Sequence, residues 1–344
     1  MSPVVVLLSP TPLDSPRGNA VTVARIARGL RARGVDARVW HAPDAAAAAA
    51  LQSEAAQMRP ALVHAFHARH AGPLGRTLAA AAGAPLVITL TGTDVSEDLP
   101  HPARGPGVRE TLRAAAGVTA FHTSVVGALG ADGSALGDRL AVVPQSVSFE
   151  PSGAATPPPI SGDPCLLFPA GIRAVKRPGL PLSALEGLVR RRPAARLWYA
   201  GPVLEPAEHA RLVDGLTARP WARHLGAVPH AAMPALFATA DIVLNCSRSE
   251  GGMANAVLEA LALGRAVLAS DIPGNRSLIE PGVTGLLFRG ETELAEGAER
   301  LAADPTLRSR LGEAGRRLVA ERFTPAVEAE GYLAIYARVW ADGR

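Results

Sequence analysis

Two cations stand side by side where an apolar run, Cys165 to Ala170, gives way to the segment Gly171-Ile172-Arg173-Ala174-Val175-Lys176. The Arg173 guanidinium is a planar fork and the Lys176 ammonium a compact point charge, so beside Gly171 they could clamp a phosphate. Lys176 is the single lysine among 35 Lys and Arg residues. A position that needs an ammonium would resist exchange for arginine. The alternative is a pair of solvated loop cations.

A polar turn follows a second apolar run, Ile242 to Asn245, and leads into a predicted helix. Glu250 lies in this turn, where its carboxylate could accept hydrogen bonds from sugar hydroxyls. Free backbone N–H groups where a helix begins can hold phosphate. Those expected here belong to Gly251, Gly252, Met253 and Ala254.

Glu259 falls within the same predicted helix, among apolar residues. A buried carboxylate is costly unless it is paired. We therefore expect a ligand or a protein partner for Glu259, the alternative being a place on a solvated face.

The turn after the first apolar run, Val4 to Leu8, leads into a predicted helix through Gly18 and Asn19. Glycine lets a ligand approach the backbone, and the amino end of a helix attracts negative charge. The alternative is an ordinary loop between a strand and a helix. This turn has no G-x-G-x-x-G pattern, so the fingerprint of dinucleotide-binding proteins is absent.

Three histidines, His64, His67 and His70, end another apolar run. No cysteine or carboxylate beside them in the sequence completes a ligand set, so we predict no metal and favour a single histidine that contacts a substrate. Thr93 and Asp94 follow the run Leu86 to Leu90. They either line an acceptor site or form a turn.

The elements that must position these residues alternate along the chain. Short apolar runs are separated by amphipathic stretches, a pattern typical of parallel sheets covered by helices. Pro151 to Pro164 contains five prolines and interrupts this pattern, so it is interpreted as a linker. The prediction is an α/β fold with two Rossmann-like parallel-sheet domains, 1–155 and 156–324, facing across a cleft. The helix expected in 325–344 either caps the second domain or packs back on the first.

The composition excludes several classes of protein. With 344 residues and 48% apolar residues, the chain can form two cores and is not disordered. No apolar run is long enough for a membrane span, and the first run lacks the basic leader of a signal peptide. Two isolated cysteines, Cys165 and Cys246, argue against a disulfide framework or a zinc site. We expect a cytoplasmic protein.

The positive charge is modest and scattered. The formal net charge is +4, and no dense basic cluster with interleaved aromatic residues indicates nucleic-acid binding. Four arginines of the first predicted helix could face an anionic membrane, but we favour ordinary solvated charges: Arg25, Arg28, Arg31 and Arg33.

The second half resembles the family 4 glycosyltransferases, which are retaining enzymes with the GT-B fold. The resemblance is strong over residues 165–325 and looser over 4–145. It is carried by Gly171, Arg173 and Lys176, by Gly226-Ala227-Val228, by Ser249-Glu250-Gly251 with Leu258-Glu259-Ala260, and by Pro273-Gly274-Asn275. Within that family the chain most resembles the glycosyltransferase-1-domain-containing group, through Gly18-Asn19-Ala20-Val21-Thr22 and Ile272-Pro273-Gly274-Asn275. It is also similar to selenosugar synthases, through His67-Ala68-Arg69 and Thr91-Gly92-Thr93-Asp94.

The resemblance implies a role for each matching residue. Arg173 and Lys176 would hold the donor diphosphate. Glu250 would bind the transferred sugar and Glu259 the ribose. The amides after Glu250 would contact the phosphates, Gly18 would let its loop close over the substrates, His67 would approach the sugar, and the segment around Val228 would hold the base. Eight residues separate the two glutamates here, whereas seven are usual in the family, so we expect a bulge in the glycine turn.

The resemblance also implies a reaction. A hexosyl or N-acetylhexosaminyl group would move from a nucleotide-diphospho sugar, UDP-linked in view of the family, to an unidentified acceptor with retention of configuration. No cofactor or metal would be needed. Two alternatives remain open: transfer from UDP-GlcNAc as in a selenosugar synthase, and a non-catalytic protein that binds sugar nucleotides. The sequence leaves the oligomeric state undetermined.

Overall fold

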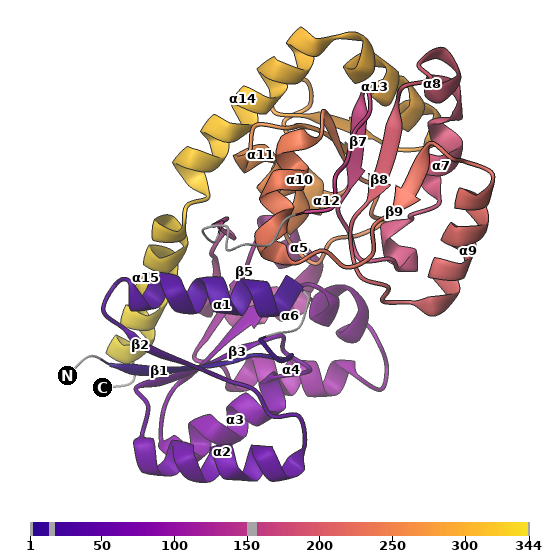
Figure 1. Ribbon diagram of the computed structural model, residues 1–344. Helices are drawn as coiled ribbons and strands as arrows, with labels where there is room; N and C mark the ends of the chain where they lie inside the picture. The colour runs from indigo at the N-terminus through magenta and orange to yellow at the C-terminus, as the bar shows by residue number, and fades with distance from the viewer. Residues whose placement is uncertain (1–2, 14–17, 150–156, 343–344) are drawn as a thin grey trace. The chain divides into compact units, whose positions relative to one another are not determined.

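The computed structural model in Figure 1 describes residues 3–13, 18–149 and 157–342, and it contains two compact units. Unit 1 comprises Met1–Ser146 and Phe323–Arg344, and unit 2 comprises Val147–Arg322. The sequence-based boundary, between residues 155 and 156, lies inside the segment 150–156 that falls outside the described residues. Each unit is built on a six-stranded parallel sheet.

The sheet of unit 1 has the strand order β2-β1-β3-β4-β5-β6. Its strands are β1 (Val4–Leu8), β2 (Asp36–Trp40), β3 (Leu62–Phe66), β4 (Leu86–Leu90), β5 (Gly117–Ala120) and β6 (Leu140–Val142). Its helices are α1 (Gly18–Arg31), α2 (Ala45–Met58), α3 (Gly72–Ala82), the π-helix η1 (Asp94–Asp98), α4 (Gly105–Ala114), α5 (Thr123–Leu129), α6 (Ala131–Leu136), the short 3-10 helix η2 (Gly137–Arg139) and α15 (Pro325–Asp342).

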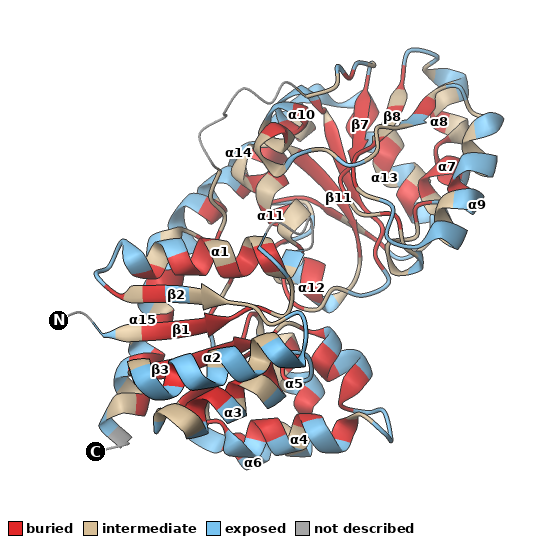
Figure 2. Cartoon of the chain, turned by 60° about the horizontal axis from the view of Figure 1, so that its bottom comes forward, coloured by how far each residue is buried: buried red, intermediate tan, exposed pale blue. Residues whose placement is uncertain are grey.

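Alternating side chains of the strands supply two apolar layers, because successive residues of a strand point to opposite faces. Val5 and Leu7 belong to the cluster formed with α1 and α15. Val63 and Ala65 belong to the cluster formed with α2, α3 and α4. Figure 2 shows the result: β1 and β3 are largely buried, whereas α2 and α4 expose one side.

Helix α15 packs within unit 1 although it is the last element of the chain. Figure 1 shows it beside α1, and Tyr332 and Tyr336 are fully buried in the same cluster. Arg25 of α1 forms a buried ion pair with Glu328, with 2.8 Å between Nη2 and Oε1. This pairing also corrects the sequence-based choice between membrane-facing and solvated arginines, because Arg25 is only 6% exposed and is neither.

The sheet of unit 2 has the strand order β12-β11-β10-β7-β8-β9. Its strands are β7 (Cys165–Phe168), β8 (Arg196–Tyr199), β9 (Ala222–His224), β10 (Ile242–Asn245), β11 (Ala266–Ser270) and β12 (Leu286–Phe288). Its helices are the 3-10 helices η3 (Ala174–Lys176) and η4 (His230–Ala232), together with α7 (Leu180–Ala184), α8 (Glu186–Arg191), α9 (Pro206–Thr217), α10 (Met233–Thr239), α11 (Asn255–Ala262), α12 (Pro273–Arg276), α13 (Glu291–Ala303) and α14 (Pro305–Arg322).

The core of unit 2 holds both cysteines in apolar surroundings. Cys165 and Cys246 are free and buried, and burial raises the pKa of each thiol to about 12. They are therefore unreactive packing residues at neutral pH. Among the helices of the described residues, none combines the length and apolarity needed to cross a membrane.

Candidate functional site

The carboxyl ends of β7 and β10, which are neighbours in the sheet of unit 2, carry the clearest candidate site. The loop after β7 is anchored by Ile172, which is fully buried and bridges to Val203. The backbone N–H of Arg248 donates to the carbonyl oxygen of Val175 at 2.8 Å. The Arg248–Val175 bond holds the β7 loop against the turn after β10, so residues far apart in sequence meet at one edge of the sheet.

Lys176 and Glu250 meet at that edge. The Lys176 Nζ lies 2.5 Å from the Glu250 Oε1, and the two side chains are 14% and 11% exposed. An ammonium carries three N–H donors, and Glu250 takes one of them. Among the described residues the other two have no partner. Lys176 is thus fixed in place while keeping donors for an anion.

Glu250 is held through one of its two oxygens. The Oε1 accepts from Lys176, from the Ser247 hydroxyl at 2.6 Å and from the Asn245 Nδ2 at 3.1 Å. Burial alone would raise the pKa of this carboxyl, but the Lys176 charge and the three hydrogen bonds outweigh burial and lower it. Glu250 is therefore ionised at neutral pH, and Oε2 has no partner among the described residues. The additional residue between the glutamates does not prevent this contact.

Arg173 and Gly171 lie in the same loop. A Cβ added to Gly171 would come within 2.6 Å of the Leu204 Cδ1, so a larger residue here would require the Leu204 side chain to move. The Arg173 guanidinium makes no hydrogen bond or ion pair to another described residue, and its Nε is buried. The structure therefore brings Lys176 to Glu250 but leaves Arg173 outside that pair.

The glycine turn after Glu250 leads into α11, which begins at Asn255. Gly251 is half-buried, and Gly252, Met253 and Ala254 are buried. Ala254 caps the helix and has no side-chain oxygen for the first amides. In the described part of the chain no acceptor is found for the backbone N–H groups of Gly252, Met253 and Ala254. This is the local arrangement that the phosphate-binding prediction requires.

Glu259, on α11, is 13% exposed and has a protein partner. The His230 Nε2 lies 2.9 Å from the Glu259 Oε1. His230 begins η4, two residues after the half-buried Val228. A ligand or protein partner for Glu259 was expected, but His230 was not identified, because its only signal in the sequence is its place just after the Gly226-Ala227-Val228 motif.

His67, at the end of β3 in unit 1, is 2% exposed and has a φ of 80°. Its Nδ1 accepts from the backbone N–H groups of Arg69 and His70, each at 3.3 Å. A nitrogen that accepts carries no proton, so Nε2 holds the ring proton and donates to the Thr93 Oγ1 at 3.0 Å. Burial lowers the pKa of His67 despite the attraction of Asp94, so the ring is neutral.

Asp94 is fully buried and is a positioning residue. Its carboxylate accepts from the backbone N–H groups of Ala68, Thr91 and Gly92 at 2.7–3.3 Å. These bonds tie the loop after β3 to the loop after β4. We correct the expectation that Asp94 lines an acceptor site, because it has no exposed surface. Thr93 is exposed and reaches His67 instead.

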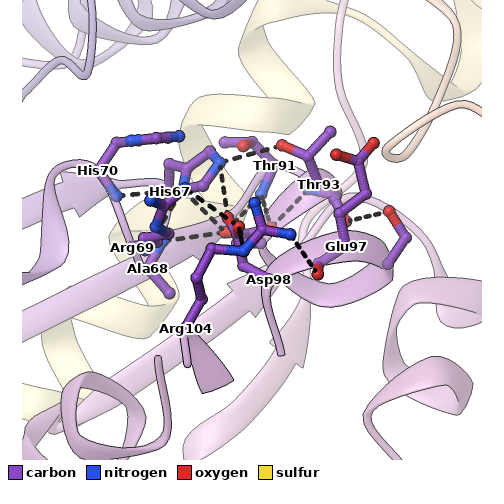
Figure 3. A network of polar contacts seen from close by, with 12 residues as sticks. His67, Ala68, Arg69, His70, Thr91, Thr93, Glu97, Asp98 and Arg104 are labelled. Atoms are coloured by element: carbon purple, nitrogen blue, oxygen red, sulfur yellow. Dashed lines mark hydrogen bonds and ion pairs between the residues drawn. The ribbon is translucent and has the colours of Figure 1, made fainter. Parts of the chain in front are cut away.

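Asp98 completes a cluster that the sequence analysis did not foresee. His67, His70 and Asp98 each have a potential metal-ligating atom, all within 4.8 Å of one another (Figure 3). The premise that no carboxylate accompanies the histidines is therefore wrong. Asp98 lies on η1, and its Oδ1 is paired with Arg69 at 3.3 Å and Arg104 at 3.2 Å.

The chemistry of this cluster fits a hydrogen-bonded histidine better than a metal ligand. A metal on the His67 Nε2, the atom 3.9 Å from the Asp98 Oδ2, would require the proton to move to Nδ1. Nδ1 already accepts two backbone N–H groups. Two guanidinium groups also neutralise Asp98. The absence of a metal remains a prediction.

Gly18 and Asn19 are the first two residues of α1, exposed and half-buried respectively. The loop that precedes them includes residues 14–17, which lie outside the described residues. Their predicted roles in closing over a ligand therefore stay predictions.

Comparison with known proteins places these features in a class. Each unit has a six-stranded sheet of parallel strands with helices on both faces. This is the GT-B fold, which the chain shares with solved glycosyltransferase structures. One is Anabaena HepE in complex with UDP and glucose, with 17% identity and a TM-score of 0.80 over 97% of this chain and 99% of that one. Another is sucrose-phosphate synthase from Thermosynechococcus elongatus, with 16% identity and a TM-score of 0.80 over 99% and 100%. At these identities the likeness shows the fold.

The sequence of unit 2 matches a family model. Residues 163–304 match the family model described as glycosyl transferases group 1, so the chain carries a glycosyltransferase group 1 domain. Glycosyltransferase 1 domain-containing protein 1 of Xenopus tropicalis is 28% identical over 173 residues, half of each chain. D-inositol 3-phosphate glycosyltransferase of Nocardia farcinica is 33% identical over 189 residues, 52% of this chain and 42% of that one. The matches thus span about half the length of these curated relatives.

Proposed function

We propose that the protein transfers a sugar from a nucleotide-diphospho sugar, UDP-linked, to an acceptor with retention of configuration and without a metal. The observation that carries the proposal is the Lys176–Glu250 pair at the carboxyl edge of the unit 2 sheet. In this pair the Lys176 ammonium keeps N–H donors that have no partner among the described residues. Beside it, the ionised Glu250 carboxylate keeps Oε2 as an acceptor. Those are the groups needed to hold a diphosphate and the sugar attached to it.

The proposed roles combine these contacts with the family resemblance. Lys176 and Arg173 neutralise the charge that develops on the departing diphosphate, and the backbone N–H groups of the glycine turn contact the same phosphates. The Glu250 Oε2 accepts from a hydroxyl of the transferred sugar. Glu259, fixed by His230, accepts from the ribose, and the segment around Val228 holds the base. His67 is assigned to the sugar on the family resemblance alone.

The mechanism we favour is a same-face displacement. The sugar leaves the diphosphate at its anomeric carbon while the acceptor attacks from the same side. The departing phosphate oxygen takes the acceptor's proton. Catalysis then rests on positioning and on electrostatic stabilisation of the leaving group. The chain's own contribution is the cation pair and the turn amides.

A panel of nucleotide sugars tests the proposal. UDP, UDP-glucose and UDP-GlcNAc are added in thermal-shift measurements, and slow hydrolysis of each sugar is followed without an acceptor. We expect a shift with at least one of them and hydrolysis that Lys176→Ala abolishes. A shift without hydrolysis or transfer to any acceptor would favour the non-catalytic alternative. Indifference to every nucleotide sugar would refute both.

A further inference from the structure

The short helix α12 packs directly against the turn that carries Glu250. A Cβ added to Gly274 would lie 2.3 Å from the carbonyl oxygen of Gly252 and 2.8 Å from the Glu250 Cβ. Neither distance is possible for a real side chain, so backbone meets backbone here. The position of Glu250 therefore depends on an element more than twenty residues away in the sequence.

Asn275, the next residue of α12, extends this dependence to the carboxylate. It is fully buried, and its Nδ2 donates to the carbonyl oxygen of Ser270 at 2.9 Å and lies 3.3 Å from the Asn245 Oδ1. The same Asn245 Oδ1 accepts from the backbone N–H of Ser247 at 3.2 Å. Two donors thus converge on one end of the Asn245 amide.

That convergence fixes which way the Asn245 amide faces. The two ends of an amide have the same shape and opposite hydrogen-bonding character. With Oδ1 held by Asn275 and Ser247, the Asn245 Nδ2 points at the Glu250 Oε1, 3.1 Å away. The flipped amide would set an oxygen against an ionised carboxylate, which is repulsive. Asn275 and the Ser247 N–H together select the orientation that stabilises Glu250 as an anion.

We propose that Asn275 is a positioning residue, acting through Asn245 to commit the Glu250 Oε1 to protein donors and to present Oε2 to a hydroxyl of the transferred sugar. This inference rests on the proposed function. It assigns a task to a residue that the sequence analysis used only as part of a motif. This role affects binding of the sugar and not binding of the nucleotide. Loss of Asn275 should therefore weaken binding of a nucleotide sugar more than binding of the nucleotide alone.

The experiment compares the affinities of UDP and UDP-glucose, measured by calorimetry, in wild type and Asn275→Ala. We expect the ratio of UDP-glucose affinity to UDP affinity to fall about tenfold, the effect of one lost hydrogen bond, with UDP affinity changed less than about twofold. Ser277→Ala is the matched control. It removes another hydrogen bond of the same short helix, from the Ser277 Oγ to the Gly274 carbonyl oxygen, and should leave the ratio unchanged.

Two binding outcomes would overturn the proposal. An unchanged ratio would show that Asn275 does not act on the sugar. Equal losses for both ligands would show a merely structural role.

A crystal structure supplies a readout that needs no ligand. In unliganded Asn275→Ala we expect the Glu250 carboxylate in more than one orientation, whereas a single unchanged conformer would refute the positioning role. If the wild type bound neither probe, the uridine-linked function would fail while this readout still decided the role of Asn275. If the variant did not fold, the wild-type structure at atomic resolution would decide. An Asn245 oxygen facing Glu250 would overturn the proposal, and a nitrogen would support it.

Discussion

The Lys176 Nζ and the Glu250 Oε1 lie 2.5 Å apart although the two residues are 74 positions apart in the chain. The contact joins the loop after β7 to the turn after β10, and three donors share the single oxygen Oε1. Each partner keeps hydrogen-bonding capacity after the contact is made. Because Lys176 keeps N–H donors and Glu250 keeps Oε2, the geometry favours a site that binds an anion and a hydroxyl side by side.

Exchange of Lys176 for arginine tests whether the site needs an ammonium. Every other Lys or Arg position of the chain holds arginine. A planar guanidinium nevertheless cannot replace a compact ammonium charge between Glu250 and a phosphate. We expect Lys176→Arg to lower kcat about tenfold and Lys176→Ala about 10²-fold or more. Both are measured as donor hydrolysis. The control Arg211→Lys, at an exposed ion pair, should keep full activity. Near-normal turnover of Lys176→Ala would refute the clamp.

The pH dependence of stability tests the Glu250 environment. Its pKa in the folded protein is lowered from 4.5, so it contributes stability above about 4.5, and that contribution is lost as pH falls through the folded pKa. In Lys176→Met the charge and the hydrogen bond of Lys176, which lower this pKa most, are lost, so the pKa of Glu250 rises. The stability difference between wild type and variant should therefore be largest near pH 7 and shrink towards pH 4.

Thermal unfolding at several pH values measures this difference. Arg211→Met, which breaks an exposed pair with Glu208, is the control and should show no comparable trend. A stability difference between wild type and Lys176→Met that is independent of pH would contradict the assignment.

Most of the sheet architecture could be predicted because buried parallel strands are continuous apolar runs. Val4–Leu8 and Leu86–Leu90 have that form and are strands as expected. β9 was missed because Ala222, Arg223 and His224 offer no such run, and its pairing with β8 at the edge of the sheet decides its conformation. Helix α15 had two possible partners in sequence terms. The contacts of Tyr332 and Glu328 place it in unit 1.

Only those site residues that directly follow a predicted strand could be identified from the sequence. Lys176 and Glu250 follow apolar runs, so both were found. Asp98 was not found, because it lies on a π-helix, 31 residues after His67, and no local pattern links the two. The wrong expectation for Asp94 has a similar origin. A polar residue at the end of a strand can face a ligand or the backbone. Only the structure shows that three backbone N–H groups donate to the Asp94 carboxylate.

Gly274→Ala tests the close approach of α12 to the glycine turn. The added methyl group would meet the Gly252 carbonyl oxygen and the Glu250 Cβ, so the turn must shift, at a cost of about 1–3 kcal/mol typical of overpacking. We expect a lower melting temperature and a loss of UDP-glucose affinity. The control is Gly179→Ala, an exposed residue with helical backbone and no atom near the added methyl. That change should alter stability by less than about 0.5 kcal/mol. Unaltered stability and affinity in Gly274→Ala would show that the turn can yield.

His64 provides a test of the unit 1 core. It is fully buried; its Nδ1 lies 2.7 Å from the Tyr336 hydroxyl of α15, and its Nε2 lies 2.7 Å from the Thr89 Oγ1. Burial lowers its pKa from 6.5 to about 3. Below pH 6.5 the His64 side chain of the unfolded chain therefore binds a proton. In the folded protein the same side chain stays neutral down to about pH 3. Stability should fall on acidification in this window by up to about 1.4 kcal/mol per pH unit from this residue.

His64→Asn removes that titration while keeping a polar side chain in the core. The variant should be less stable at pH 7, because the contact with Tyr336 is lost, yet its stability should decline less steeply between pH 6 and pH 4, by one proton. Denaturant unfolding at fixed pH values gives the two slopes. His101→Asn, at an exposed histidine of the same unit, is the control and should follow the wild type. Parallel pH profiles for wild type and His64→Asn would mean that His64 is charged in the folded protein, and the buried network with α15 would then need a different account.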